Sequence, residues 1–319
     1  MYKAVITDFG VETPDIEGSI LQPLGCEVVR GRCKTADEVI AAVSDADYVM
    51  TGFAPINARV IEAMTKTRII VRYGIGVDNV DLEAAAKRGI PVCNIPDYCI
   101  NEVADQTLAL TLALTRQIVS NWDGIRRGEW KLALPREQTR ALRDMTVGLV
   151  AFGRISREVA SRLRPFRCQI GVFDPMVDAA VIKQAGCAAL GWDELLATSD
   201  LISLHCPSTA KTRGMINRET LARMKPASLL VNTSRGDLIN TADLIAALQS
   251  GHTAGAGLDV TNPEPIPKDS PLLTMKNVII SPHSASVSER ALLTLRTSVA
   301  NAVAFAVRGE RPPNIVNGL

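Results

Sequence analysis

Residues 145–175, MTVGLVAFGRISREVASRLRPFRCQIGVFDP, decide the fold of this chain. The apolar run at 146–151 predicts a buried strand, and a turn at Phe152 and Gly153 leads into a helix over 154–163. A second strand at 169–173 ends on Asp174. The start of such a helix offers N–H groups to an anion, and a carboxylate at the second strand end suits ribose hydroxyls. The stretch therefore predicts a βαβ unit that binds a dinucleotide.

The glycine pattern of this turn is incomplete. Where the dinucleotide fingerprint has Gly-x-Gly-x-x-Gly, this chain has Ala151, Gly153 and Ser156. The middle glycine, at which the backbone approaches the phosphates, is present. Taken alone, the stretch leaves a second interpretation open, a βαβ unit whose small residues serve only packing.

The composition is that of an ordinary globular chain. Its 319 residues favour two domains, and 47% hydrophobic with only 4% aromatic residues suits α/β layers. A net charge of +1 produces no overall electrostatic attraction to nucleic acid or to an anionic membrane. No apolar run approaches the ~18 residues that a membrane-spanning helix needs. Seven scattered cysteines without Cys-x-x-Cys, and three histidines, argue against a metal site. We expect reduced thiols in a cytoplasmic protein, because the chain starts with a strand instead of a secretory signal.

The order of the elements predicts two similar units. Strands and helices alternate over 1–93 and again over 146–281, which is typical of parallel sheets covered on both faces. Between them, a buried helix is predicted from an N-cap at Asn101 to about Arg127. A last helix over 287–307 is expected to return to the first unit. We therefore expect an α/β fold of two doubly wound parallel-sheet domains, with a Rossmann cofactor domain (101–285) inserted into a flavodoxin-like substrate domain (1–100 plus 286–319).

A loop of the first unit carries two glycines beside a basic residue. Gly74 and Gly76 follow Arg72 at the end of a predicted strand. Such a loop can present backbone N–H groups to an anion. A plain turn from strand to helix explains the same residues, so both interpretations stay open at this point.

Three predicted strand ends of the second unit carry reactive side chains: Arg235, Glu264 and His283. The carboxyl ends of parallel strands meet at one edge of a sheet, so we expect these side chains near the dinucleotide. A histidine beside a carboxylate suits acid–base chemistry near neutral pH, and the planar arginine fork suits a substrate carboxylate. Together these groups match the needs of hydride transfer between a cofactor and a 2-keto acid.

Six separated segments, in this order, carry a resemblance: GLVAFGRIS, VFDP, LHCPSTAKTRG, VNTSRGDLI, GLDVTNPEP and SPHSA. The chain resembles the D-isomer-specific 2-hydroxyacid dehydrogenase family over nearly all of residues 70–290. Within that family it resembles a short form of phosphoglycerate dehydrogenase or glyoxylate–hydroxypyruvate reductase. No regulatory carboxy-terminal domain is expected, because the chain ends at Leu319.

The resemblance implies NAD as cofactor and gives roles to individual residues. It implies that Arg235, Glu264 and His283 form the catalytic set and that Asp259 holds the nicotinamide carboxamide. The cofactor-binding residues that it implies are Thr107, Gly153, Arg154, Ile155, Asp174, Pro207, Thr233, Asp259 and Ala285. The substrate-binding residues that it implies are Phe53, Arg72, Tyr73, Gly74, Ile75 and Gly76.

We therefore predict an NAD-dependent oxidoreductase that transfers hydride between nicotinamide and C2 of a small D-2-hydroxy acid or 2-keto acid. Asp174 favours NAD over NADP, because a 2′-phosphate would meet a carboxylate. A homodimer is expected from the resemblance, with no nucleic-acid partner and no membrane partner. The alternative is an NADH-binding interaction protein similar to the transcriptional corepressors of this fold. Formate-type oxidation is disfavoured, since formate enzymes carry Gln at the position of Glu264.

Overall fold

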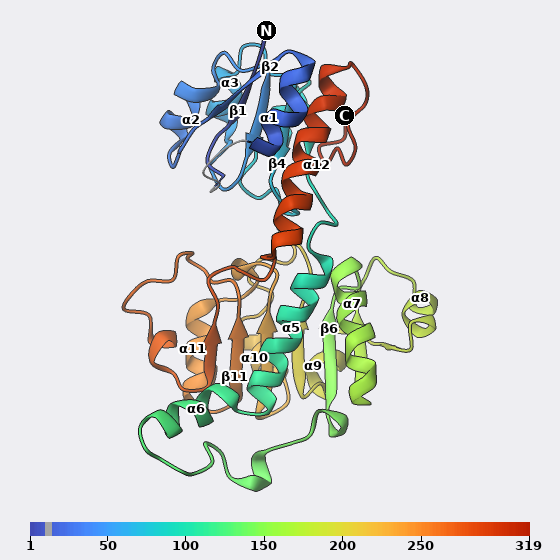
Figure 1. Ribbon diagram of the computed structural model, residues 1–319. Helices are drawn as coiled ribbons and strands as arrows, with labels where there is room; N and C mark the ends of the chain where they lie inside the picture. The colour runs from blue at the N-terminus through green and yellow to red at the C-terminus, as the bar shows by residue number, and fades with distance from the viewer. Residues whose placement is uncertain (10–14) are drawn as a thin grey trace. The chain divides into compact units, whose positions relative to one another are not determined.

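The computed structural model describes residues 1–9 and 15–319, and the chain forms two compact units (Figure 1). One unit comprises Met1–Tyr98 and Ser288–Leu319, and the other comprises Cys99–Val287. The predicted boundaries fall within about two residues of these limits. Which unit binds substrate and which binds cofactor stays a prediction.

A five-stranded parallel sheet forms the centre of the first unit. Its spatial order is β2-β1-β3-β4-β5, which is the flavodoxin-like order of a doubly wound sheet. Strands β3 and β4 consist largely of buried apolar residues because helices cover both of their faces. The strands are β1 (Tyr2–Ile6), β2 (Cys26–Arg30), β3 (Tyr48–Thr51), β4 (Ile69–Arg72) and β5 (Val92–Cys93).

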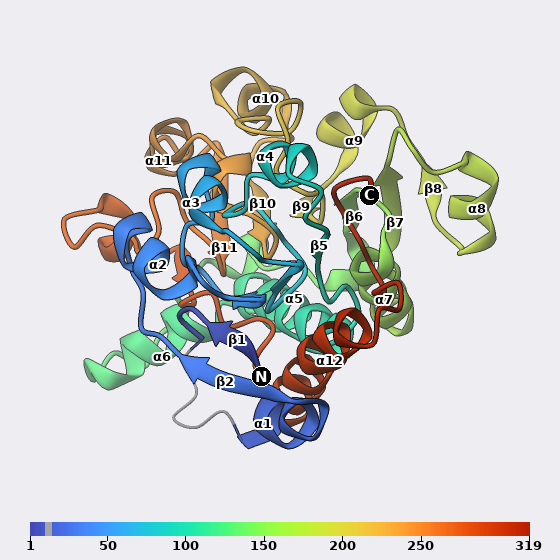
Figure 2. The same ribbon diagram turned by 90° about the horizontal axis from the view of Figure 1, so that it is seen from above.

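The helices of the first unit lie on both faces of this sheet (Figure 2). Helices α1 and α12 pack together over one face, and α2, α3 and α4 pack over the other. Polar side chains start most of them; Thr35 and Glu38, for example, form a capping box on α2. The helices are α1 (Asp15–Leu21), α2 (Ala36–Val43), α3 (Ala58–Ala63), α4 (Leu82–Lys87) and α12 (Glu289–Val307), with a short 3₁₀ turn η1 (Gln22–Leu24).

The second unit contains a seven-stranded sheet in the order β12-β11-β10-β9-β6-β7-β8. All its neighbouring strands are parallel, and the order reverses between β6 and β9, as in a dinucleotide-binding sheet. The α/β class with two doubly wound parallel sheets is therefore confirmed. The strands are β6 (Thr146–Val150), β7 (Gln169–Phe173), β8 (Ala188–Ala189), β9 (Leu201–Leu204), β10 (Ser228–Asn232), β11 (Thr253–Leu258) and β12 (Val278–Ile280).

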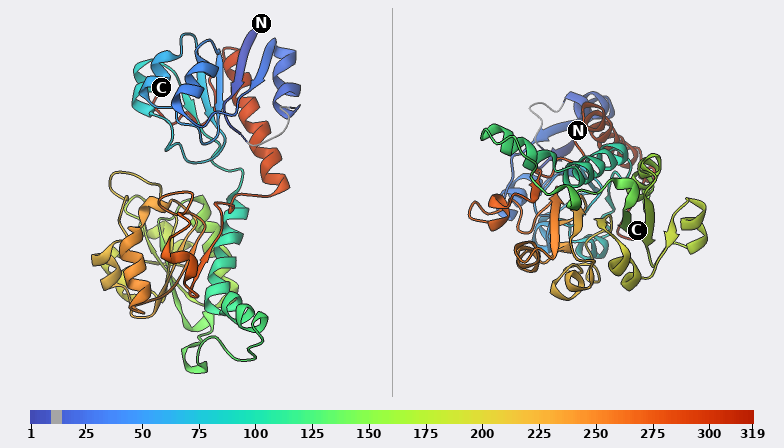
Figure 3. Two further views of the ribbon diagram at one scale, coloured as in Figure 1. Left: turned by 90° about the vertical axis from the view of Figure 1, so that its left-hand side faces the viewer. Right: turned by 90° about the horizontal axis from the view of Figure 1, so that it is seen from below.

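Helices cover both faces of the second sheet (Figure 3), and a hydrophobic cluster lies on each face. Helices α5 and α7 cover one face, and α9, α10 and α11 cover the other. The helices are α5 (Ile100–Thr115), α6 (Ile118–Arg126), α7 (Arg154–Leu163), α8 (Ala179–Gln184), α9 (Trp192–Thr198), α10 (Arg218–Arg223) and α11 (Thr241–Gln249). The 3₁₀ turns of this unit are η2 (Arg136–Gln138), η3 (Leu142–Asp144), η4 (Arg164–Phe166), η5 (Gly236–Leu238) and η6 (Pro271–Thr274).

The single helix predicted from Asn101 to Arg127 is wrong. It is divided into α5 and α6 because Gln117 adopts a left-handed conformation with φ 53°, which ends the regular hydrogen bonding. The N-cap of α5 is Cys99 instead of Asn101. Helix α8 was not predicted.

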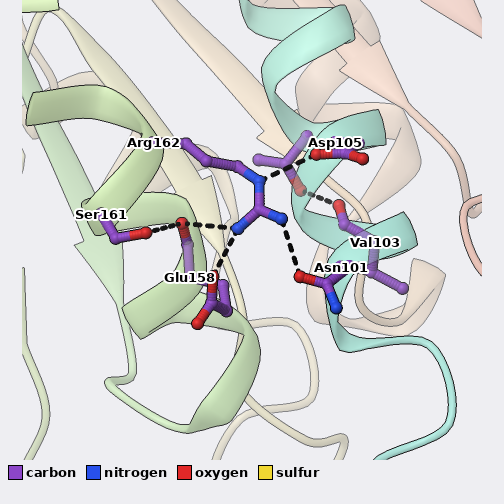
Figure 4. Close-up of polar contacts among 7 residues, drawn as sticks. Asn101, Val103, Asp105, Glu158, Ser161 and Arg162 are labelled. Carbon is purple, nitrogen blue, oxygen red and sulfur yellow. Dashed lines mark hydrogen bonds and ion pairs between the residues drawn. The ribbon is translucent and has the colours of Figure 1, made fainter. Parts of the chain in front are cut away.

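Arg162 ties α7 to the first two turns of α5 (Figure 4). Its Nε donates to Asp105 Oδ1 at 2.8 Å, and its Nη2 donates to Asn101 Oδ1 at 2.8 Å. Its Nη1 bonds Glu158 on its own helix. Asn101 therefore holds the start of α5 by accepting a hydrogen bond from a neighbouring helix, although it is not the cap of α5.

None of the seven cysteines, all of which lie in the described part of the chain, forms a disulfide, and six of them are buried. Within residues 1–9 and 15–319, no helix combines the length and apolar character needed to cross a membrane.

Candidate active site

The turn between β6 and α7 offers an open helix N-terminus. Gly153 is the N-cap of α7, so the cap residue has no side chain that could accept hydrogen bonds from the first turn of this helix. A Cβ atom built on Gly153 would have no heavy atom within 4 Å. The turn therefore leaves space at a set of N–H groups, as a dinucleotide pyrophosphate requires. Arg154 and Ile155 are the first two residues of this helix.

Ala151 shows why the fingerprint prefers glycine at its first position. Its φ is +74°, in the left-handed region that a side chain disfavours. Ser156, at the third position, is fully buried in the first turn of α7, where a small side chain permits close packing. The turn therefore stays open although Ala151 and Ser156 stand where the fingerprint has glycine.

Asp174 lies directly after β7 and faces the same turn. Its Oδ2 accepts the N–H of Phe152 at 2.7 Å, and its Oδ1 accepts the N–H of Met176 at 2.7 Å. These two bonds hold the carboxylate at the carboxyl end of the sheet. The position matches the one from which such a residue bonds the adenosine ribose of a bound dinucleotide.

The loops after β10 and β11 approach each other closely. Asn232 Nδ2 donates to the carbonyl of Arg235, and the N–H of Ser234 donates to Asn232 Oδ1, which fixes the loop that carries Arg235. A Cβ on Gly236 would lie 2.0 Å from the carbonyl oxygen of Thr261. Only glycine permits this approach, so Gly236 brings the Arg235 loop against the segment that leads to Glu264.

The His283 ring bonds Glu264. Its Nδ1 lies 2.6 Å from Glu264 Oε1, across the loops after β11 and β12. Partial burial opposes ionisation of Glu264, but the hydrogen bond and charge of His283 outweigh it and lower the pKa of Glu264 below its ordinary value. The imidazole is thereby oriented by a carboxylate, which is the arrangement of an acid–base pair.

The other two histidines have different surroundings. His205 Nε2 pairs with the Ser203 hydroxyl at 2.9 Å, and burial lowers the pKa of His205 to about 4. His205 is therefore neutral at pH 7. His252 Nε2 bonds the carbonyl oxygen of Leu221. His283 is thus the histidine whose ring bonds a carboxylate.

Asp259 is 1% exposed and bonds the loop that carries His283. Its Oδ1 accepts the Ser281 hydroxyl and the Ser284 N–H, and its Oδ2 accepts the Ala285 N–H at 2.9 Å. Gln106 on α5 donates in turn to Ser281. These contacts give Asp259 a structural task that the sequence did not reveal, and its binding of a carboxamide stays a prediction.

The remaining predicted cofactor residues lie on the same unit. Thr107 on α5 and Thr233 after β10 share a buried hydrogen bond of 2.8 Å. Pro207 follows β9, and its carbonyl accepts the hydroxyl of Thr212. All of the residues predicted to bind cofactor lie between 107 and 285, at the carboxyl edge of the second sheet or on helices beside it.

The predicted substrate residues belong to the first unit. The guanidinium carbon of Arg72 lies 5.3 Å from the centre of the Phe53 ring. Gly74 has φ 140°, and a Cβ there would lie 1.6 Å from Arg72 Nη1. The Ile75 carbonyl accepts Asn94 Nδ2 at 2.6 Å, and Gly76 completes the loop. The substrate role of these residues stays a prediction.

Tyr73 differs from its neighbours because its side chain is buried. Its hydroxyl donates to Glu17 Oε1 at 2.9 Å, and Glu17 also forms a two-bond ion pair with Arg296 of α12. Burial, and next the charge of Glu17, raise the pKa of Tyr73 well above its ordinary value. Any contact of Tyr73 with substrate would therefore involve its backbone.

Comparison with known proteins identifies relatives of the whole chain. A model described as the NAD binding domain of D-isomer specific 2-hydroxyacid dehydrogenase matches residues 108–285. A glyoxylate reductase of Korarchaeum cryptofilum is 39% identical, with 92% of this chain and 87% of the relative covered. A D-3-phosphoglycerate dehydrogenase of Mycobacterium tuberculosis is also 39% identical over 88% of this chain, which spans 53% of that protein.

A solved structure shows the same fold over almost the full length. It is D-lactate dehydrogenase from Aquifex aeolicus complexed with NAD and lactic acid. The TM-score is 0.89 at 28% sequence identity, and the match covers 99% of each chain.

Proposed function

This chain belongs to the D-isomer specific 2-hydroxyacid dehydrogenase family, and on that premise we propose that it interconverts a D-2-hydroxy acid and its 2-keto acid with NAD. The observation that carries the proposal is the 2.6 Å bond between His283 and Glu264. It lies on the edge of the sheet that also carries the open turn at Gly153.

His283 is proposed as the acid–base group. The bond from Nδ1 to Glu264 places the ring proton of the neutral form on Nδ1, so Nε2 is the atom that exchanges a proton with substrate. In the oxidation direction Nε2 accepts the proton of the C2 hydroxyl, and in reduction it returns a proton to the carbonyl oxygen. Glu264 stabilises the protonated ring in either direction.

Arg235 is proposed to bind the substrate carboxylate. A guanidinium presents two parallel donors to a carboxylate, which fixes C2 relative to the imidazole. The loop that carries Arg235 is braced by Asn232 and packed by Gly236 against Thr261. The predicted substrate residues Phe53 and Arg72–Gly76 are proposed to contact the same substrate, a small keto acid.

The site is suited to NAD. NAD supplies the hydride acceptor when it is bound, and the residues that would hold it are those of the Gly153 turn together with Thr107, Asp174, Pro207, Thr233, Asp259 and Ala285. The Asp174 carboxylate suits two ribose hydroxyls and would repel a 2′-phosphate.

A homodimer is part of the proposal, and an exposed apolar face supports it. Ile118, Trp122 and Ile125 recur along one face of α6, and the following segment exposes Trp130 and Leu132. Such a group of exposed apolar side chains is typical of an interface. Light scattering should give the mass of two chains, and the double variant W122Q/I125Q should give one. The variant V181Q, on exposed α8, should remain a dimer; a monomeric wild-type protein would exclude this part of the proposal.

The activity is tested by NADH oxidation with glyoxylate, hydroxypyruvate, pyruvate and bulkier 2-keto acids. We expect turnover with at least one of these acids. The variant H283A should lose it by about 10²–10⁴-fold while it retains NADH binding, which is measured by fluorescence titration. Tight NADH binding without turnover of any acid would instead favour a nucleotide-dependent interaction protein.

A further inference from the structure

Phe53 presents an aromatic ring at the carboxyl edge of the first sheet. It follows β3 by two positions and is 68% exposed. Ligands of doubly wound sheets bind beyond this edge. The ring lies beside the Arg72 guanidinium, at 5.3 Å from its central carbon.

Asp8 binds the turn that carries Phe53. This carboxylate lies just beyond β1, and it accepts the N–H groups of Gly52, Phe53 and Ala54 at 2.8, 2.6 and 2.8 Å. The hydroxyl of Thr7 donates to the same carboxylate at 2.6 Å. Hydrogen bonds to a carboxylate are stronger than neutral ones, so three consecutive residues are fixed by one side chain.

Asn79 binds the same turn through its carbonyl groups. Its Nδ2 donates to the carbonyl of Ala54 at 2.7 Å and to the carbonyl of Gly52 at 3.2 Å. The turn is thus held on its N–H side by Asp8 and on its C=O side by Asn79. Support from two side chains is expected for a three-residue turn when a side chain on that turn, here Phe53, must be positioned accurately.

We propose that Asp8 and Asn79 are positioning residues for substrate recognition. They hold the 52–54 turn so that the Phe53 ring contacts the substituent on C3 of the 2-keto acid. The substrate class that follows is a keto acid with a short apolar substituent, since an aromatic ring offers apolar area and no charge. This inference rests on the proposed dehydrogenase function.

The test compares two substrates that differ at C3. Glyoxylate has no C3, whereas 2-oxobutyrate carries a short apolar group; kcat and KM are measured for both with saturating NADH. In D8N and in N79A we expect the ratio of kcat/KM for 2-oxobutyrate to that for glyoxylate to fall about tenfold. The fall should come from KM for 2-oxobutyrate, and F53A should show the same fall.

A double-variant cycle separates positioning from general damage. If Asp8 acts through Phe53, D8N should change the ratio little in an F53A background. The matched control is D47N, because Asp47 accepts the Lys3 N–H at 2.8 Å at the opposite end of the same sheet. D47N should lower stability without changing the substrate ratio.

Three results would overturn the inference. They are an unchanged ratio in D8N and N79A, equal effects of D8N with and without Phe53, and a wild-type protein that reduces glyoxylate but not 2-oxobutyrate. If D8N does not fold, the substrate ratio in N79A still tests the inference, because Asn79 supports the carbonyl side of the same turn. A wild-type protein that reduces no keto acid overturns the proposed function first, and this inference with it.

Discussion

The N–H of His283 donates to the carbonyl oxygen of Asp259 at 2.8 Å, and the Asp259 carboxylate accepts the next two N–H groups of the same loop. His283 itself has φ 52°, which is a strained conformation for a residue with a side chain. Asp259 thus holds the proposed acid–base residue in a backbone conformation that it would not otherwise prefer.

Replacement of Asp259 by Asn should lower kcat by about 10–100-fold, because an amide offers one acceptor oxygen where the loop presents three donors. Steady-state kinetics at saturating NADH and substrate measure this. The variant D178N, in which Asn retains the cap of α8, is the control and should keep wild-type kcat. Equal kcat in D259N and wild type would contradict a positioning role for Asp259.

The variant G236A should lower kcat/KM by at least about 100-fold and also reduce the melting temperature. The new methyl group would lie 2.0 Å from the Thr261 carbonyl, so the Arg235 and Glu264 loops must separate. Its control is G191A, where a Cβ has no atom within 4 Å and φ is −69°. Similar activities for the two variants would show that the loops tolerate separation.

At position 151, backbone conformation predicts opposite results for two substitutions. The φ of +74° disfavours a branched side chain, so A151V should lower the free energy of unfolding by about 2 kcal/mol. A151G should not lower it, because glycine adopts this φ without strain. Urea unfolding measures the difference, and NADH titration shows whether the turn still binds. A stable A151V protein would mean that the turn rearranges.

Asp174 should determine the choice of cofactor. D174A removes the charge that disfavours a 2′-phosphate, so the preference for NADH over NADPH should fall at least about tenfold. The ratio of kcat/KM for the two cofactors measures this preference. Because Asp174 also accepts the Phe152 N–H, thermal unfolding of the same variant separates a change in selectivity from a change in the turn. An unchanged ratio in a folded variant would remove Asp174 from cofactor recognition.

Asp200 makes stability depend on acid pH. Burial opposes its ionisation, but bonds from Lys225, the Thr146 N–H and Arg140 outweigh this and lower its pKa. A lowered pKa in the folded state stabilises the protein above the unfolded pKa of about 4, and this stability is lost as pH falls through the folded pKa. Unfolding free energies from pH 7 to about pH 3 should therefore fall less steeply in D200N than in wild type. Parallel curves would exclude this contribution.

The positions of most strands along the chain could be predicted from the sequence because buried parallel strands appear as short apolar runs. The break at Gln117 could not be predicted. Neither proline nor glycine marks it, and its left-handed backbone is a property of the folded state. Helix α8 was missed because its six residues are too few for a clear periodic pattern.

Residues of the candidate site could be predicted where they belong to a sequence motif. They could not be predicted where their role depends on a contact that forms only in the folded chain. The pair of His283 and Glu264 follows from strand ends that meet at one edge of a sheet. The contacts of Asp8 with the 52–54 turn could not be predicted, because these partners lie far along the chain. Tyr73 stands among loop residues in the sequence, yet Glu17 and Arg296 from two helices provide partners that bury it.

The turn at 52–54 resembles a small anion-binding site in which the bound anion, the Asp8 carboxylate, belongs to the same chain. Tethering keeps the Asp8 carboxylate at a high effective concentration beside three converging N–H groups. Shortening this side chain to alanine would leave those groups around a space the size of a carboxylate. Formate added from solution could then replace the missing group, so the order of this loop would become a function of the concentration of a free ion.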